Sequence, residues 1–297
     1  MDTLQAQAFH QKVRKLWAFF VLDPRHYQIG ILSSLIFIGI FKFGFVIPWW
    51  HALACIGAAI GTQIFCDKSI GKKFDIRSPL ISSLSLTLLL RTSSIWLSLA
   101  AGILAIGSKY LIRSKGKHIF NPANFGIVIV ALLFAGAWVS PGQWGSAPML
   151  ILWITGLGIL VTGKARSWDL TVFFLIIYAS LTFIRALWLG DPLSIPVHQL
   201  QSGAMLLFAF FMISDPMTTP NARLGRFFYA AFVASIGFTI QTFFYNSAGI
   251  IYALIFTAPL VPVFDHLFLA KAYQWPKFIQ NQNPKGVSHD KTIQTYS

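Results

Sequence analysis

Polar and small residues gather in one stretch of an otherwise apolar sequence, between positions 202 and 220. A proline disfavours the α conformation of the residue before it, so Pro216 is expected to end a helix close to Asp215. The carbonyl groups freed at such an end cannot face lipid and must line protein or a cavity. Together with the hydroxyl of Ser202 or Ser214, they predict a cation site. An interfacial turn capped by a solvated Asp215 accounts for the same residues without a ligand.

A second short segment, Ser78–Thr87, carries residues of the same kind. Its hydroxyl groups are candidates to line an ion path, and they include Ser82, Ser83 and Thr87. The alternative is that they bond to the preceding helical turn or to a neighbouring helix. If the two segments meet within the membrane, Leu207 and Phe211 lie four residues apart on one helical face and are candidates for an apolar gate, with ordinary packing as the alternative.

The composition places these segments in a membrane. Of the 297 residues, 56% are hydrophobic and only 11% are charged, whereas a soluble domain carries about 25% charged residues. We therefore expect an all-α polytopic membrane protein with about ten transmembrane segments. The apolar segments are 28–47, 48–66, 79–91, 94–112, 119–139, 148–163, 168–189, 203–215, 227–244 and 249–270.

Two of these segments, 79–91 and 203–215, hold only about 13 residues, a length typical of a broken or re-entrant element. The distribution of the 23 lysines and arginines follows the positive-inside rule if the short segments also cross and the N- and C-termini are cytoplasmic. Arg77 and Arg223 then share the cytoplasmic face of an inner (plasma) membrane, and Arg91 falls in an outer loop. The net charge of +14 is interpreted as a collar facing anionic lipid, not as a nucleic-acid surface.

The two halves of the chain share landmarks at one offset. Asn121 and Asn246 begin the fifth segment of each half, 125 residues apart, while Pro79 and Gly203 begin the short third segments, 124 apart. Five crossings is an odd number, so the second half runs opposite to the first, and inverted repeats of this kind place the working site near the midplane. Close packing of helices at small residues is the alternative explanation. The predicted regions are a cytoplasmic segment 1–27, repeats 28–139 and 148–270, and a cytoplasmic tail 271–297.

The sequence carries no signature of a soluble enzyme. It has no phosphate-binding loop, dinucleotide fingerprint, zinc-ligand spacing or nucleophile elbow, so we assign no catalytic residue and no metal cluster. Asp265, beside His266 at the end of the last segment, is interpreted as a structural partner of the basic collar. A proton relay is the other interpretation, because ionisable groups inside membranes are often functional.

Three motifs, in register with this topology, resemble the RnfD and NqrB family of membrane subunits. The matching residues are Ser202–Thr218, Asn121–Ala123, and Asn246–Ala253 with Pro259 and Asp265, which resemble the family's eighth helix, the start of its fifth and its tenth. The resemblance covers about residues 25–271. It implies a subunit of the Rnf or sodium-pumping NADH:quinone oxidoreductase complexes, where electron transfer is coupled to transport of Na⁺ or H⁺.

The resemblance also implies a flavin, either FMN or riboflavin, near the paired short helices. The residues expected to hold it are Asn121, Ser202, Gly203, Asp215, Thr218 and Thr219, and the expected ion path comprises Ser82, Ser83, Thr87, Leu207, Phe211 and Ser214. Relatives carry an FMN esterified to a threonine in a long loop between the fifth and sixth helices. Here that loop is residues 140–147 and contains no threonine. We therefore expect a non-covalent flavin and no covalent FMN.

Membrane lipid and the other subunits of an Rnf- or Nqr-like complex are the expected partners. Two other functions fit the same residues. One is a redox-independent secondary transporter or channel with inverted repeats, and the other is a non-catalytic membrane scaffold. The residues do not identify the transported ion, the electron donor or the acceptor, and any enzymatic activity would belong to the whole translocase.

Overall fold

The computed structural model describes residues 23–141, 144–145 and 148–273. Most of the two predicted cytoplasmic segments, 1–27 and 271–297, therefore lies outside the described residues. The first half consists of α2 (Pro24–Phe43), α3 (Trp49–Ser69), α4 (Arg77–Leu89), α5 (Ile95–Leu111) and α6 (Pro122–Leu133).

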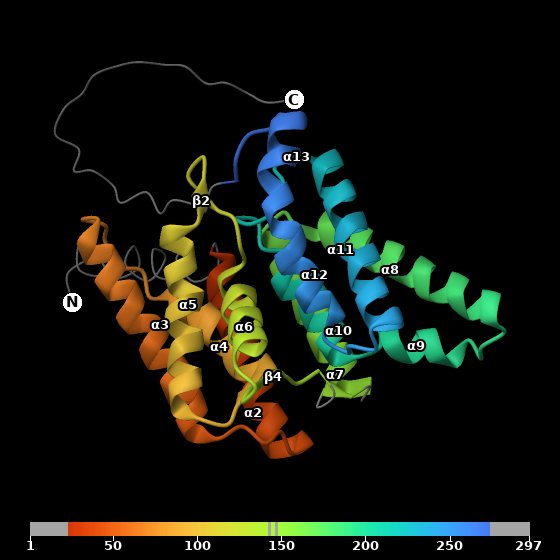
Figure 1. Cartoon of the computed structure of the whole chain (residues 1–297), viewed down its shortest axis with the longest axis horizontal. Helices are drawn as coiled ribbons and strands as arrows, with labels where there is room; N and C mark the ends of the chain where they lie inside the picture. The colour runs from red at the N-terminus through yellow and green to blue at the C-terminus, as the bar shows by residue number, and fades with distance from the viewer. Residues whose placement is uncertain (1–22, 142–143, 146–147, 274–297) are drawn as a thin grey trace, which may run out of the picture. The chain divides into compact units, whose positions relative to one another are not determined.

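The second half has more breaks. Its elements are α7 (Pro148–Lys164), α8 (Trp168–Leu189), α9 (Ser194–Leu200), α10 (Gly203–Leu207), the π-helix η2 (Phe208–Met212), α11 (Arg223–Phe243), α12 (Gly249–Thr257), the 3₁₀ turn η3 (Ala258–Leu260) and α13 (Val261–Leu267). In Figure 1, α3 and α5 lie on one side and α8 and α11 on the other, with α4, α6, α10 and α12 between them.

Five described helices are long and apolar enough to cross a membrane: α2, α3, α8, α11 and the run Gly249–Leu267. The pair Ser194–Leu200 and Gly203–Met212 passes the same test together but bends by 46°, as a broken span does. Three shorter apolar helices, α5, α6 and α7, accompany them. The chain is therefore a polytopic helical membrane protein.

The fold is mostly helical, as predicted, but short strands follow α4 and α6. The backbone leaves α4 at Leu89 and becomes β1 (Leu90–Thr92), which pairs antiparallel with β4 (Ala137–Val139). Ser140 N–H donates to Leu89 O (2.9 Å) and Ser93 N–H donates to Gly136 O (2.8 Å), so the ladder continues on both sides. Extended backbone in lipid needs such pairing, because an unpaired carbonyl or amide is costly there.

A tight hairpin follows α5. Its strands β2 (Arg113–Ser114) and β3 (Lys117–His118) are joined by Lys115 and Gly116. Both joining residues have positive φ angles, 47° and 86°, which is the backbone of a type I′ turn. The turn places the side chain of Lys117 beside the second half of the chain, as described below.

Two Asp-x-Arg sequences tie the start of α2 to the start of α4. Asp23 and Asp75 each accept the backbone N–H and the guanidinium of the arginine two residues later. The arginines also exchange partners, with Arg25 2.7 Å from Asp75 and Arg77 2.6 Å from Asp23. Burial alone would raise the pKa of Asp75, but the hydrogen bonds and charges of Arg77 and Arg25 outweigh it and lower this pKa to about 2.

Candidate functional site

Asn121 connects the start of α6 to the end of η2. Its side-chain oxygen accepts the N–H of Asn124 (3.1 Å), which caps α6. Its amide nitrogen donates to Met212 O (3.3 Å) and, over a longer distance, to the Asp215 carboxylate (3.5 Å). The other Asp215 oxygen accepts Met217 N–H (3.0 Å), so this carboxylate caps the turn that ends the broken helix.

Thr218 and Thr219 complete the same turn and are buried, with 3% and 2% of their surfaces exposed. Thr218 donates its hydroxyl to Asp215 O (3.3 Å). The Thr219 hydroxyl is buried and has no hydrogen-bond partner among the described residues. Four of the six predicted flavin residues therefore share one location, the inner turn, which we define as Asn121, Asp215, Thr218 and Thr219.

Ser202 and Gly203 lie elsewhere. They begin α10, and η2 separates them from the inner turn; ten helical residues span about 15 Å. Gly203 N–H donates to Gly145 O (3.1 Å), and a Cβ at Gly203 would lie 3.1 Å from Cβ of Trp144. The buried Trp144 ring in turn contacts Phe45, with ring centroids 5.1 Å apart. The short loop before α7 thus packs against the start of α10.

The predicted ion-path hydroxyls bond within their own helices. In α4, Ser82 donates to Ser78 O (3.2 Å), Ser83 to Leu80 O (3.1 Å) and Thr87 to Ser83 O (2.9 Å). At the end of the broken helix, Ser214 donates to Phe210 O (2.5 Å). Each hydroxyl oxygen retains lone pairs that can accept a hydrogen bond or contact a cation.

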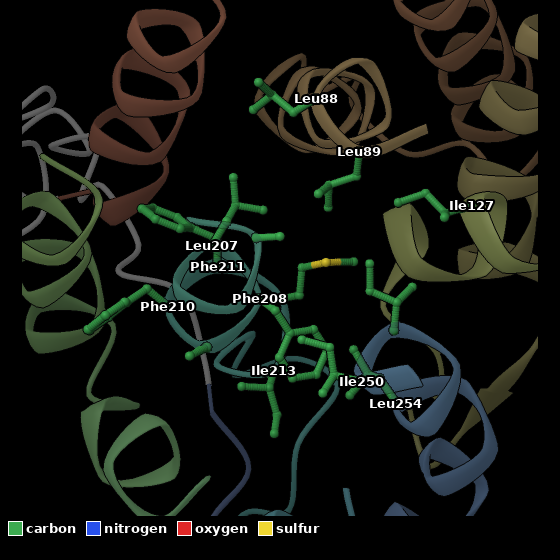
Figure 2. Packing of buried hydrophobic residues seen from close by; sticks show 14 of the residues in the cluster. Leu88, Leu89, Ile127, Leu207, Phe208, Phe210, Phe211, Ile213, Ile250 and Leu254 are labelled. Atoms are coloured by element: carbon green, nitrogen blue, oxygen red, sulfur yellow. The ribbon is translucent and has the colours of Figure 1, made fainter. Parts of the chain in front are cut away.

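An apolar layer separates the two short helices. Figure 2 shows Leu89 of α4 pointing toward the layer that also holds Leu207, Ile127 of α6 and Leu254 of α12. Leu207 and Leu89 are fully buried, and Phe211 is 3% exposed. Leu207 and Phe211 thus lie within the continuous core, and their role as an apolar gate stays a prediction.

Lys117 is a site residue that the sequence did not indicate. Its ammonium donates to Thr219 O (2.6 Å) and Asn221 Oδ1 (3.0 Å) and forms an ion pair with Asp265 (3.1 Å). Asp265 also accepts Asn221 N–H (2.7 Å). The interpretation of Asp265 as a structural partner of the basic collar is confirmed. The hairpin of the first half thereby fixes the turn that follows η2.

Comparisons with known proteins find related sequences. Residues 132–274 match the family model described as the NQR2, RnfD, RnfE family. The RnfD protein of the ion-translocating oxidoreductase complex of Citrobacter koseri is 30% identical over 123 residues, which is 41% of this chain and 35% of that protein. The corresponding protein of Cronobacter sakazakii is 29% identical over 159 residues, 53% of this chain and 44% of the relative. That of Salmonella newport is 30% identical over 145 residues, covering 48% and 39%.

Each of these matches spans less than half of the relative's length. The segment matched by the family model includes the broken helix, three of the four inner-turn residues (Asp215, Thr218 and Thr219) and the last helices, but neither α4 nor Asn121. The predicted family resemblance is confirmed, and two of its three motifs, Ser202–Thr218 and Asn246–Ala253, lie within the matched segment.

Proposed function

We propose that this chain is a member of the NQR2, RnfD, RnfE family, whose model matches residues 132–274, and that it is a membrane-embedded subunit of an ion-translocating oxidoreductase complex. It would couple electron transfer to movement of Na⁺ or H⁺ across the inner membrane. The observation that carries the proposal is the family match over residues 132–274, which contains the broken helix and Asp215, Thr218 and Thr219 of the inner turn. The other subunits of such a complex, and membrane lipid, are the proposed partners.

The same proposal includes ten crossings arranged as two inverted five-segment halves. α4 has 13 residues, about 20 Å of helix, and the strand after it adds about 10 Å, so together they match a hydrocarbon core of about 30 Å. Contacts between the ends of segments support crossings that alternate in direction. Lys42 at the end of α2 meets Met149 at the start of α7 (3.1 Å), as expected if both ends face outward.

Contacts at the opposite ends support the same arrangement. Lys109 at the end of α5 donates to Ser78 at the start of α4 (2.7 Å). Arg226 in the first turn of α11 pairs with Asp169 at the start of α8 (3.1 Å). Together with the Lys117–Asp265 pair, these contacts join ends that the positive-inside rule assigns to the cytoplasm. The N- and C-termini are proposed to share that side.

The inner turn is the proposed location of a non-covalent flavin. Its buried Thr219 hydroxyl, which has no partner among the described residues, fits a polar ligand atom, and the Asn121 amide and the Asp215 carboxylate contact each other in the same turn. Ser202 and Gly203, in contact with the loop at the other end, do not fit the same ligand. A bound flavin supplies transfer of one or two electrons, while the chain binds it, orients it and excludes water. Leu207 and Phe211 are proposed to keep the ion path dry.

Gentle purification followed by spectroscopy and mass spectrometry tests this proposal. We expect flavin absorbance, flavin released by acid, and an unmodified chain mass. Thr219→Val should weaken flavin binding about fivefold, since one hydrogen bond is worth about 1 kcal/mol and one factor of ten about 1.4 kcal/mol. Ser202→Ala, at the other end of the broken helix, is the matched control and should retain flavin.

A colourless preparation, or equal flavin loss in both variants, would refute the proposed site. A flavin-phosphate adduct on the chain would refute the non-covalent attachment. Uptake of Na⁺ by liposomes that contain the chain alone, without any electron donor, would favour the redox-independent transporter instead.

A further inference from the structure

Fixed groups bind several carbonyls at the end of α4. The last carbonyls of a helix lack intrahelical donors, and here α4 stops inside the bundle at Leu89. Leu86 O accepts the N–H of Leu90, and Leu89 O accepts the N–H of Ser140 (2.9 Å). Two further carbonyl oxygens at this end, Thr87 O and Leu90 O, bind a positively charged side chain.

That cation is Arg91. Its Nη1 donates to Thr87 O and to Leu90 O, each at 2.8 Å, and only 7% of the residue is exposed. Arg91 therefore lies in the buried strand β1 and not in a loop as predicted, and its side chain turns back against the helix it follows. Guanidinium keeps its charge in proteins, and the carbonyl end of a helix is its negative pole. Arg91 thus sits where a free cation would find the same oxygen ligands.

Neighbouring groups hold β1, and with it Arg91, in place. Arg91 is opposite Trp138 in the β1–β4 ladder. On the next residue, the Thr92 hydroxyl lies 2.7 Å from the Ser98 hydroxyl, which is 2.8 Å from His51 Nδ1. His51 and Ser98 are fully buried. The ladder pairing at Arg91 and the side-chain contacts at Thr92 therefore fix the strand that carries the guanidinium.

The second broken helix has no cation in the corresponding role among the described residues. Its freed carbonyls accept from neutral side chains: Ala209 O from Thr171 (2.7 Å), Phe210 O from Ser214 (2.5 Å) and Met212 O from Asn121 (3.3 Å). The two short helices thus differ in charge, although they share length and hydroxyl content. At the α4 end a guanidinium binds the helix carbonyls, whereas the ammonium of Lys117 binds Thr219 O, beyond the last turn of the other helix.

We propose that Arg91 is a tethered cation that determines where ions can pass. Its guanidinium fills the carbonyl end of α4 and excludes free Na⁺ from that side of the bundle, which leaves the second broken helix as the cation route. The assignment of a cation route rests on the proposed function, whereas the occupation of the α4 carbonyls by a tethered cation does not. The predicted path hydroxyls of α4, Ser82, Ser83 and Thr87, then serve helix packing.

Chemical rescue tests the tethered cation directly, with the full chain in detergent. Arg91→Ala leaves a space shaped for a guanidinium, so millimolar ethylguanidinium should raise the thermal unfolding midpoint of this variant and leave the wild type unchanged. Arg185→Ala is the matched control, because Arg185 pairs with Asp191 at a side chain that is 40% exposed; it should show no rescue. If folded Arg91→Ala can be purified only in the presence of ethylguanidinium, that result would support the proposal equally.

A folded Arg91→Ala that does not respond to ethylguanidinium would overturn the proposal. So would failure to recover it with ethylguanidinium when Arg91→Lys is recovered, because the carbonyl end would then require a covalently attached side chain rather than a cation. The same variants separate the second part of the inference. In liposomes with a potassium-valinomycin potential and no electron donor, Arg91→Ala should leak Na⁺ about tenfold faster than the wild type, and Arg91→Lys should stay tight.

A folded, rescued Arg91→Ala that is as tight to Na⁺ as the wild type would refute the exclusion role and leave only a structural cap. This outcome is independent of the proposed function, which depends on donor-driven transport. If the wild type shows no donor-driven transport but Arg91→Ala leaks, the tethered cation stands and the proposed function falls.

Discussion

At the scale of single residues, the contacts of Lys117 govern the inner turn. Its side chain extends from the β2–β3 hairpin of the first half and donates hydrogen bonds to Thr219 O, Asn221 Oδ1 and Asp265 Oδ2 of the second half. The side chains of Lys117 and Asp265 are only 14% and 13% exposed. A buried pair of this kind gives little net stability by itself, but removing one partner leaves an uncompensated buried charge.

Lys117→Met should therefore destabilise the folded chain by about 3 kcal/mol, measured as a lower thermal unfolding midpoint in detergent. Asp191→Asn is the control, because it breaks the half-exposed Arg185–Asp191 pair and should cost under about 1 kcal/mol. Equal, small effects of the two substitutions would show that Lys117 does not hold the turn.

Residue types alone could not identify these partners. Asp215, Thr218, Thr219 and Asn121 were recognisable because a proline and an asparagine-proline pair mark helix ends. Lys117 lies 102 residues from the carbonyl it binds, and a basic residue in a collar gives no sign of its partner. The same limit applies to Arg91, whose burial follows from the path of β1.

At the scale of elements, the broken helix in the second half depends on close packing against α7. η2 carries Phe210, and the ring of Phe210 approaches Gly158 so closely that a Cβ there would lie 2.5 Å from Phe210 Cγ. π-helical turns are rare and frequently occur at functional sites. Thr171 of α8 holds the turn from another side by donating to Ala209 O (2.7 Å).

Gly158→Ala should destabilise the chain by about 1–3 kcal/mol, the usual cost of overpacking a core. Gly156→Ala is the control on the same helix, because a Cβ at that position meets nothing within 4 Å, and it should be neutral or stabilise by up to about 1 kcal/mol. Thermal unfolding of the two variants in parallel measures the difference. Equal stability of the two would contradict the packing of η2 on α7.

Most helices were predicted from the lengths of the apolar segments and from the residues that interrupt helices. The exceptions have physical causes. The short segments 79–91 and 203–215 were predicted, and α4 and α10–η2 occupy nearly those residues. The single helices predicted at 119–139 and 249–270 are interrupted. The first changes into β4, and the second contains η3 where Pro259 and Pro262 interrupt the backbone donors. The pairing of β1 with β4 joins residues far apart in the sequence, so the local pattern of apolar residues does not predict it.

At the scale of the whole molecule, the proposed function depends on two five-segment halves that run in opposite directions. The same-side contacts between helix ends support it: Lys42 with Met149 at one end, and Lys117 with Asp265 at the other. The nearly equal separations of Asn121 from Asn246 and of Pro79 from Gly203 predicted this arrangement from the sequence. The difference in charge between α4 and the second broken helix was not visible there, because both segments have similar polar residues.

Accessibility of single cysteines in membrane vesicles measures this topology most directly. In a chain whose own Cys55 and Cys66 are replaced by serine, Lys73→Cys and Arg223→Cys report on two exposed inner positions, and Tyr245→Cys reports on an outer position that is 90% exposed. An impermeant maleimide should label the first two only in inverted vesicles and the third only in right-side-out vesicles. Labelling of positions 73 and 223 from opposite sides would contradict the inverted repeat.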